Sequence, residues 1–165
     1  MKYIIITIIG LSLSISSFGQ ESKYKALFIY KFMQNIEWPA DKVASQYTVA
    51  VLGDSEVLDQ LTTLTSGRKI NGKSISVVSY SGSISGVNLL FLSRNNEDQF
   101  DSINKEAISN AVVLVTESKG FAKKGATINF NNEGGKLKFE MNPATLSASG
   151  LTASGSIKSL AVLVN

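Results

Sequence analysis

The amino-acid sequence predicts a single-domain α/β fold with a mixed sheet that is parallel in its centre and carries helices on both faces. Short apolar runs at 88–92 and 111–115 are typical of strands buried on both sides, as in parallel sheets covered by helices. Residues 126–131 and 136–141 alternate between apolar and polar side chains, which predicts a C-terminal antiparallel hairpin. At 165 residues, the chain is long enough to bury one core without cross-links.

The N-terminal segment is typical of a secretory signal peptide. Lys2 supplies a positive charge, residues 4–15 are apolar, and Ser17 and Gly19 are the small residues expected before a cleavage site. We therefore predict a signal peptide at 1–19 and an exported domain at 20–165. The alternative is an uncleaved membrane anchor, which so short an apolar run does not favour.

The first half of the domain predicts a helix, a strand, a second helix and a second strand. Apolar residues recur at helical spacing through 22–37, and Trp38-Pro39 ends this helix because a residue before proline avoids the α region. Residues 47–52 are a predicted strand, followed by a turn and another helix. A further strand is predicted at 74–80. The second helix has an apolar face made of Val57, Leu58, Leu61 and Leu64.

The second half predicts helices around the apolar strands and the hairpin. We expect Asn95 or Asn96 to cap a helix whose inner face contains Phe100, Ile103 and Ala107. After the hairpin, Asn142-Pro143 predicts the start of a short helix that Gly150 closes. The spacing of Ile157, Leu160, Ala161 and Val164 predicts a final amphipathic helix.

The composition argues against several kinds of function. The chain has no cysteine, which excludes disulfides, thiol chemistry and cysteine-ligated metals, and no histidine, the commonest metal ligand and general base. We therefore expect no metal, no cofactor and no enzymatic activity. With Lys2 removed, fifteen basic and thirteen acidic residues leave a net charge of +2. The lysines are scattered, so we expect no nucleic-acid partner.

Residues 67–74 match the P-loop pattern G-x-x-x-x-G-K-[ST] letter for letter. A phosphate-binding loop needs a strand before it and a helix after it, so that backbone amides and the helix dipole face the phosphate. Here a predicted helix precedes the segment and a β-prone run follows. We therefore predict a turn on Asn71-Gly72 that leads into a strand.

A small ligand is conceivable at the end of the first strand. Gly53, Asp54 and Ser55 follow that strand, and open α/β sheets bind ligands beyond the carboxyl ends of their strands. Phe121, in a later loop, is a second candidate there. Capping of the next helix by Asp54 or Ser55 explains the same residues and is favoured. The acidic residues show no close pairing, so a catalytic carboxylate pair is a weaker hypothesis.

The aromatic residues near the first helix are the stronger candidates for a binding surface. Phe28, Tyr30 and Phe32 cannot all face inward, because successive helical positions rotate by about 100°. Either another element covers the second side of the helix, or an exposed aromatic patch receives a partner. We expect most of these residues to pack in the core and one or two to contact a partner. The set consists of Tyr24, Phe28, Tyr30, Phe32 and Trp38.

Several short motifs occur in an order and spacing typical of one protein family. In the first half they are Tyr30-x-Phe32, Glu37-Trp38-Pro39, Val51-Leu52-Gly53, Gly67-Arg68 and Ile70-Asn71-Gly72-Lys73. In the second half they are Leu90-Phe91-Leu92-Ser93, Val113-Leu114-Val115-Thr116, Gly120-Phe121, Ile128-Asn129-Phe130, Phe139-Glu140-Met141-Asn142, Gly150-Leu151 and Leu160-Ala161. Together they resemble the YfiR family of small exported bacterial proteins over residues 22–164.

The resemblance implies a periplasmic, non-enzymatic α/β regulator. Its best-known member represses an inner-membrane diguanylate cyclase by binding the periplasmic sensor domain, and an outer-membrane-associated lipoprotein relieves that repression. Related domains are fused to sensor histidine kinases. Because this chain lacks the cysteines of that member, redox regulation is not expected. The segment 142–158 also lacks an arginine often found there.

Two functional hypotheses follow. The first is a periplasmic repressor that binds a membrane sensor protein, a diguanylate cyclase or histidine kinase, through Phe28, Tyr30, Phe32 and the Trp38-Pro39 corner. The second is a periplasmic small-molecule sensor or carrier with its ligand near Gly53 and Phe121. A homodimer is compatible with either.

Overall fold

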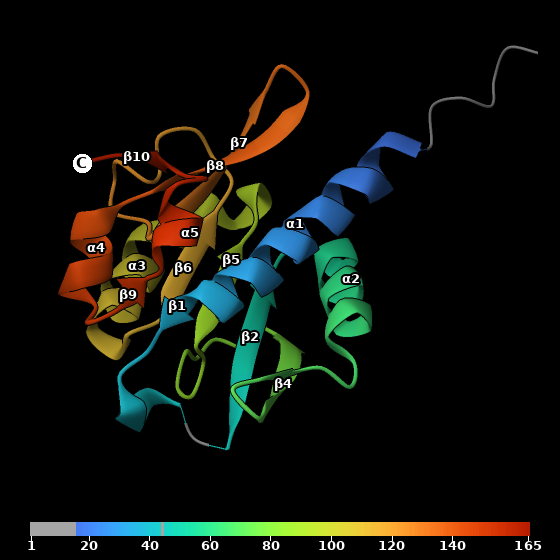
Figure 1. The fold of residues 1–165 in the computed structure, drawn as a ribbon. Coiled ribbons are helices and arrows are strands. Elements are labelled where there is room, and N and C mark those ends of the chain that lie inside the picture. Colours follow the sequence, from blue (N-terminus) through green and yellow to red (C-terminus); the bar gives the residue numbers. More distant parts are fainter. Residues whose placement is uncertain (1–15, 44) are drawn as a thin grey trace, which may run out of the picture.

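The structure is a computed structural model that describes residues 16–43 and 45–165 (Figure 1). The predicted signal peptide at 1–19 lies outside the described residues, apart from the positions from Ser16 onward that begin α1. The helices are α1 (Ser16–Asn35), η1 (Ala40–Lys42), α2 (Ser55–Thr65), η2 (Arg94–Gln99), α3 (Phe100–Asn110), α4 (Pro143–Ala148) and α5 (Gly155–Lys158). The strands are β1 (Ile36–Glu37), β2 (Gln46–Leu52), β3 (Lys69–Ile70), β4 (Lys73–Ser79), β5 (Leu89–Leu92), β6 (Val113–Thr116), β7 (Ile128–Glu133), β8 (Lys136–Met141), β9 (Thr152–Ala153) and β10 (Val162–Leu163).

The main sheet confirms the predicted architecture. Its eight strands lie in the order β10-β8-β7-β6-β5-β2-β4-β3. The central strands, from β4 through β2, β5 and β6 to β7, pair in parallel. β7 and β8 form the predicted antiparallel hairpin, with Phe130 opposite Phe139. A separate two-stranded sheet joins β1 to β9 antiparallel.

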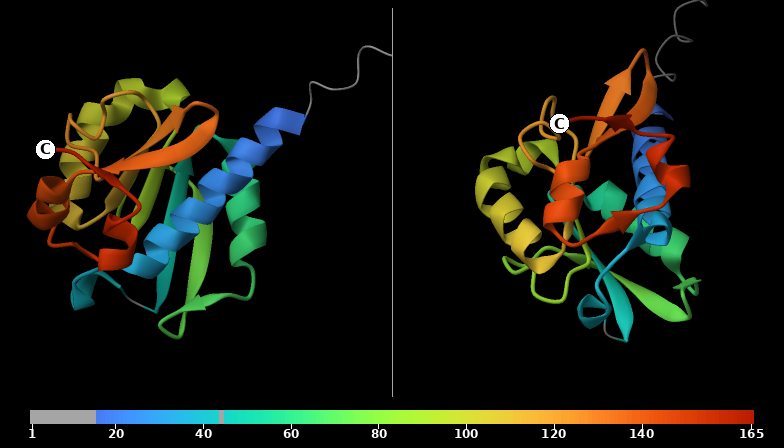
Figure 2. Two further views of the ribbon diagram at one scale, coloured as in Figure 1. Left: turned by 45° about the horizontal axis from the view of Figure 1, so that its top comes forward. Right: turned by 60° about the vertical axis from the view of Figure 1, so that its left-hand side comes forward.

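Helices cover both faces of this sheet, as the apolar central strands predicted (Figure 2). On one face, α1 and α2 pack against strand residues such as Val49, Phe91 and Val115. On the other face, α3 packs against the alternate residues, such as Leu90 and Leu114. Every residue of β5 and β6 is buried as a result, which explains why these strands have no polar alternation.

Several local signals in the sequence form as predicted. The Asp54 side chain accepts a hydrogen bond from the Val57 amide at 2.9 Å and caps α2. Asn142 caps α4 through the Thr145 amide, with proline next in the helix. Gly150, with φ of +68°, follows the C-terminal end of α4. Backbone amides at the starts of α2 and α4 are therefore satisfied by side chains that the sequence already identified.

The predicted cap of α3 is wrong. A 3₁₀ turn, η2, precedes α3, and neither element has a side-chain cap from Asn95 or Asn96. The Asn96 side chain instead accepts a hydrogen bond from the Ser93 hydroxyl at 3.2 Å. Because this contact uses the Asn96 carbonyl oxygen, the residue serves the loop after β5 rather than the helix.

The predicted C-terminal amphipathic helix is also wrong. α5 ends at Lys158, and β10 follows as a strand paired in parallel with β8. The Val164 amide donates to the Met141 carbonyl at 3.0 Å, and Leu160 is 67% exposed instead of facing the core. The edge of β8 offers ladder hydrogen bonds to a segment rich in β-branched residues, and this tertiary pairing overrides the helical spacing.

Candidate functional site

The aromatic face of α1 is largely part of the core. Phe28 and Phe32 pack on the hairpin, with the Phe32 ring centroid 4.9 Å from that of Phe139 and 5.9 Å from that of Phe130. Phe32 is fully buried, whereas Phe28 is partly exposed and lies 5.5 Å from Phe139. Of these two predicted site residues, only Phe28 offers surface to a partner in this conformation.

Tyr30 points to the other side of α1, and that side is covered. The Arg68 guanidinium lies 5.4 Å from the Tyr30 ring centroid, and the Gln34 amide donates to the Tyr30 hydroxyl at 3.1 Å. Tyr30 is only 7% exposed. The structure therefore favours the first alternative for Tyr30, in which another element covers the second side of the helix.

The Trp38-Pro39 corner is the part of the predicted site that lies at the surface. Both side chains are half-buried, in the turn between β1 and η1. The Trp38 ring meets Tyr47 edge-on at 5.7 Å, and its indole N–H donates to the Asn88 carbonyl at 3.2 Å. Pro39 lies beside Gly150 at the end of α4. The corner is thus an aromatic feature held in one orientation and still partly open to solvent.

Asn88 fixes this corner, a role that sequence reasoning missed. It is 2% exposed, and its side-chain amide donates to the Lys42 carbonyl while its side-chain oxygen accepts from the Thr48 amide, both at 2.9 Å. These bonds connect the segment after Trp38 to the start of β2. The only available signal was a polar residue directly before the apolar run of β5.

Gly53 lines a cavity of about 300 Å³ at the carboxyl ends of β2 and β4. Its φ is +84°, and an added Cβ would lie 1.8 Å from the Asn96 side-chain oxygen and 2.4 Å from the Ser93 hydroxyl. Close approach of the η2 loop therefore explains this glycine without a ligand. The cavity is formed by Val51, Gly53, Asp54, Ser55, Leu58 and Ser79.

Phe121 does not line the Gly53 cavity. It is 7% exposed, with its ring centroid 4.5 Å from that of Phe100 and the Lys124 ammonium 4.7 Å from the ring. These contacts place Phe121 in the second core cluster, between the β6–β7 loop and α3. The structure does not bring the two residues of the small-molecule hypothesis into one pocket.

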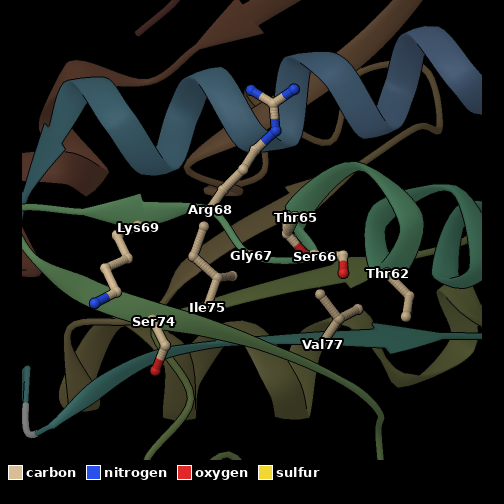
Figure 3. A pocket seen from close by; sticks show the side chains of 9 residues that line it. All are labelled: Thr62, Thr65, Ser66, Gly67, Arg68, Lys69, Ser74, Ile75 and Val77. Carbon is tan, nitrogen blue, oxygen red and sulfur yellow. The ribbon is translucent and has the colours of Figure 1, made fainter.

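The P-loop pattern at 67–74 folds as the predicted turn. Asn71 and Gly72 have φ of +51° and +78° and connect the antiparallel strands β3 and β4. The Lys73 ammonium donates to the Val43 carbonyl at 2.7 Å, so it is engaged in holding another loop. Gly67, Arg68 and Lys69 line an open pocket of about 270 Å³ next to the C-terminal end of α2, with Arg68 extending toward α1 (Figure 3). A helix C-terminus carries negative partial charge, the opposite of a phosphate cradle.

Comparisons with known proteins identify the family of the chain. A family model described as YfiR/HmsC-like matches residues 22–162. The chain belongs to the YfiR/HmsC-like family. The match includes α1 from Ser22 onward, the Trp38-Pro39 corner and the whole main sheet except its last residue. No curated protein matches the chain significantly.

A solved structure shares the fold. The crystal structure of a conserved domain protein from Vibrio cholerae O1 biovar El Tor superposes with a TM-score of 0.55 at 9% sequence identity. The alignment covers 87% of this chain and 60% of that one, so this chain spans about three fifths of its length. At such low identity, the likeness shows the fold alone.

The YfiR/HmsC-like family is regulatory and periplasmic.

The buried lysine of α1 has a structural role. Lys25 on α1 forms ion pairs with Glu117 after β6, at 2.5 Å, and with Glu21, at 2.9 Å. The Arg94 amide donates to the other oxygen of Glu117 at 2.9 Å. Burial lowers the pKa of Lys25, but the two carboxylates more than offset this and hold it above 10.5. The Lys25–Glu117 ion pair therefore connects α1 to the segment that follows β6 of the sheet.

None of the helices within 16–43 and 45–165 is both long and apolar enough to cross a membrane. In the same residues, acidic side chains do not gather in groups of three or more that would suit a metal ion.

Proposed function

We propose that this YfiR/HmsC-like protein is a non-enzymatic periplasmic regulator that binds the extracytoplasmic sensor domain of an inner-membrane signalling protein. The preferred partner is a diguanylate cyclase, which the bound regulator represses, and a sensor histidine kinase is the other candidate. An outer-membrane-associated lipoprotein that sequesters the regulator would relieve repression. Family membership supports the regulatory role. To repress, the protein must bind the inactive state of the sensor more tightly than the active state.

The observation that carries the proposal is the Trp38-Pro39 corner. Aromatic residues dominate binding energy at protein interfaces when they are held rigidly and their partner completes the burial. Trp38 meets the first condition through Tyr47 and Asn88, and its half-buried state leaves surface for a partner. Phe28 adds a second partly exposed ring on α1.

Site-directed photo-crosslinking in intact cells tests the proposal. A photoreactive amino acid replaces Ala40, an exposed residue beside the corner, and in a control strain it replaces Lys105, an exposed residue of α3 on the opposite face of the sheet. We expect the Ala40 position to capture a membrane protein that has an extracytoplasmic sensor domain, and the Lys105 position not to capture it. Deleting the gene should raise cyclic-di-GMP. Equal capture of the membrane protein from both positions contradicts the proposal. So does a deletion strain in which neither the cyclic-di-GMP level nor the activity of a sensor histidine kinase changes.

A second candidate function is a small-molecule sensor, which the cavity at Gly53 favours. Its volume of about 300 Å³ suits a small metabolite, and it lies at the carboxyl ends of parallel strands. A ligand that binds only the folded protein raises its thermal midpoint in proportion to the logarithm of ligand concentration. A metabolite screen by thermal shift should therefore find a stabilising compound, and Ser79→Phe, which fills the cavity, should abolish the shift. Failure of every compound to stabilise the protein removes this candidate.

A further inference from the structure

β4 is only partly covered at the edge of the main sheet. β3 is the last strand on that side, and it pairs antiparallel with β4 only at Lys73 and Ser74. β4 continues to Ser79, so residues 75–79 have no strand of the described chain beside them on the side away from β2. A row of unpaired backbone N–H and C=O groups is a template on which another extended chain can pair.

One hydrogen bond shows which backbone groups of β4 face this free edge. The Tyr80 amide, directly after β4, donates to the Val51 carbonyl of β2 at 2.9 Å. Successive residues of a strand direct their N–H and C=O groups to opposite sides. Tyr80 and every second residue before it therefore face β2. Ile75, Val77 and Ser79 alternate with those residues, so their backbone groups face the free edge.

The free edge borders the open pocket of about 270 Å³ beside the last turn of α2 (Figure 3). Ile75 and Val77 of β4 line this pocket, and so do Thr62 and Thr65 of α2. Ile75 and Val77 are only partly buried there. A strand paired with β4 would direct every second side chain to the face of the sheet that carries Ile75 and Val77, and hence toward this pocket. The pocket is small and open, which suits an extended chain better than an enclosed metabolite.

The charge beside this edge is positive. Arg68 and Lys69 line the pocket, are exposed, and form no ion pair with a carboxylate of the described residues. None of the described residues that line the pocket is acidic. The carbonyls of Thr62 and Thr65, in the last turn of α2, already accept backbone hydrogen bonds, which reduces the negative potential of the helix end. The edge is therefore complementary to a chain that carries carboxylates.

We propose that the free edge of β4 binds an extended, acidic peptide segment of a partner protein, which adds to the sheet as a strand beside residues 75–79. Backbone hydrogen bonds give such strand addition its affinity, and pockets for alternate side chains give it specificity. Arg68 and Lys69 attract carboxylates and repel a second copy of this chain, whose edge carries the same two cations. The proposal does not depend on what the Trp38-Pro39 corner binds.

Titration of the purified, isotope-labelled protein with a peptide, followed by nuclear magnetic resonance, tests the proposal. The probe is the capped heptapeptide acetyl-EVTVEVT-amide, and the comparison peptide acetyl-KVTVKVT-amide has lysine in place of glutamate. We expect the acidic peptide to shift the amide signals of Ile75, Val77 and Ser79 in a saturable manner. The basic peptide should bind at least about fivefold more weakly. Hydrogen exchange of the same three amides should slow when the acidic peptide binds, because strand pairing uses their N–H groups.

Charge reversal at the edge tests how the peptide is selected. Lys69→Glu should weaken binding of the acidic peptide about fivefold, because it replaces an attraction by a repulsion. Arg68→Glu combined with Lys69→Glu should make the protein prefer the basic peptide. Lys105→Glu is the matched control, because it changes the net charge equally at an exposed position of α3, and it should leave binding unchanged.

Three results would overturn the proposal. The first is the absence of shifts at Ile75, Val77 and Ser79 when the acidic peptide is present at millimolar concentration. The second is equal binding of the acidic peptide by the wild type and by Lys69→Glu, because the cations would then not select the peptide. The third is the same set of shifts with sodium glutamate alone, because the pocket would then take a free anion and no strand would be added.

Discussion

At the scale of single residues, buried asparagines connect loops that the sequence places far apart. Asn142 caps α4 and also donates its side-chain amide to the Ala122 carbonyl at 2.9 Å. Asn88 connects the start of β2 to the Lys42 carbonyl in the same way. Each side chain satisfies both a backbone donor and a backbone acceptor, so its removal leaves buried polar groups unpaired.

Substitution of Asn142 should separate its two roles. Asn142→Ala removes the cap and leaves the Ala122 carbonyl without its donor, so we expect a loss of about 2 kcal/mol in the free energy of unfolding. Asn142→Ser retains a capping oxygen without adding a buried charge and removes the amide donor, so it should cost less. Urea denaturation of the three proteins measures this. Equal losses for both variants would mean that the cap contributes nothing.

A side chain at Gly53 would have to displace the side chains of Asn96 and Ser93. Gly53→Ala combines a positive φ with a severe overlap against Asn96, and we expect it to destabilise the protein by more than about 2 kcal/mol. Gly67→Ala is the control, because Gly67 has a φ of +69° but no atom within 4 Å of its added Cβ. It should cost about 1 kcal/mol. Similar midpoints for the two variants in thermal denaturation would contradict the proposed role of the η2 loop.

At the scale of elements, local signals predicted those elements whose cause is local. The caps of α2 and α4, the Asn71-Gly72 turn and the end of α1 before Trp38-Pro39 all depend on residues within a few positions. The prediction of a C-terminal helix failed because Val162 and Leu163 pair with β8, about twenty residues away. Helical spacing contains no information on that partner strand. As a binding surface, the Trp38-Pro39 corner stays a prediction from the sequence. The part played by Asn88, whose backbone carbonyl accepts the Trp38 hydrogen bond from 50 residues away, could not be predicted.

The corner should therefore loosen when Asn88 is changed. Asn88→Ala leaves the Lys42 carbonyl and the Thr48 amide unpaired, and we expect a loss of about 2 to 3 kcal/mol in stability. Trp38 is the single tryptophan in the chain, so its fluorescence reports on the corner alone. The emission maximum should shift to longer wavelength as the indole becomes more exposed. Asn95→Ala, at an exposed position in η2, is the control and should leave the spectrum unchanged.

At the scale of the whole molecule, α1 holds the fold together by contacts at both of its ends. Its C-terminal half packs on the hairpin through Phe28 and Phe32, and its N-terminal half reaches the β6 end of the sheet through Lys25 and Glu117. The Ser22 hydroxyl also donates to Glu56 of α2 at 3.2 Å. Because the candidate corner directly follows α1, a change in how α1 sits on the sheet would move Trp38. Binding of a partner to this corner would then depend on the Lys25–Glu117 ion pair.

The Lys25–Glu117 ion pair should stabilise the fold at neutral pH and lose this effect at high pH. Its side chains are 9% and 11% exposed, and Lys25→Met, which leaves the Glu117 carboxylate buried without its cation, should cost about 3 kcal/mol near neutral pH. The pKa of Lys25 is raised above its ordinary 10.5 in the folded state, so the pair's contribution is fully present below pH 10.5 and is lost as the pH rises through the raised value. The stability difference between wild type and Lys25→Met should therefore shrink above pH 10.5 in urea titrations at stepped pH. Lys138→Met removes the pair with Glu133, in which the two side chains are 52% and 66% exposed, and at neutral pH it should cost far less stability than Lys25→Met. If the two variants lose equal stability at neutral pH, the Lys25 pair does not hold α1 to the sheet.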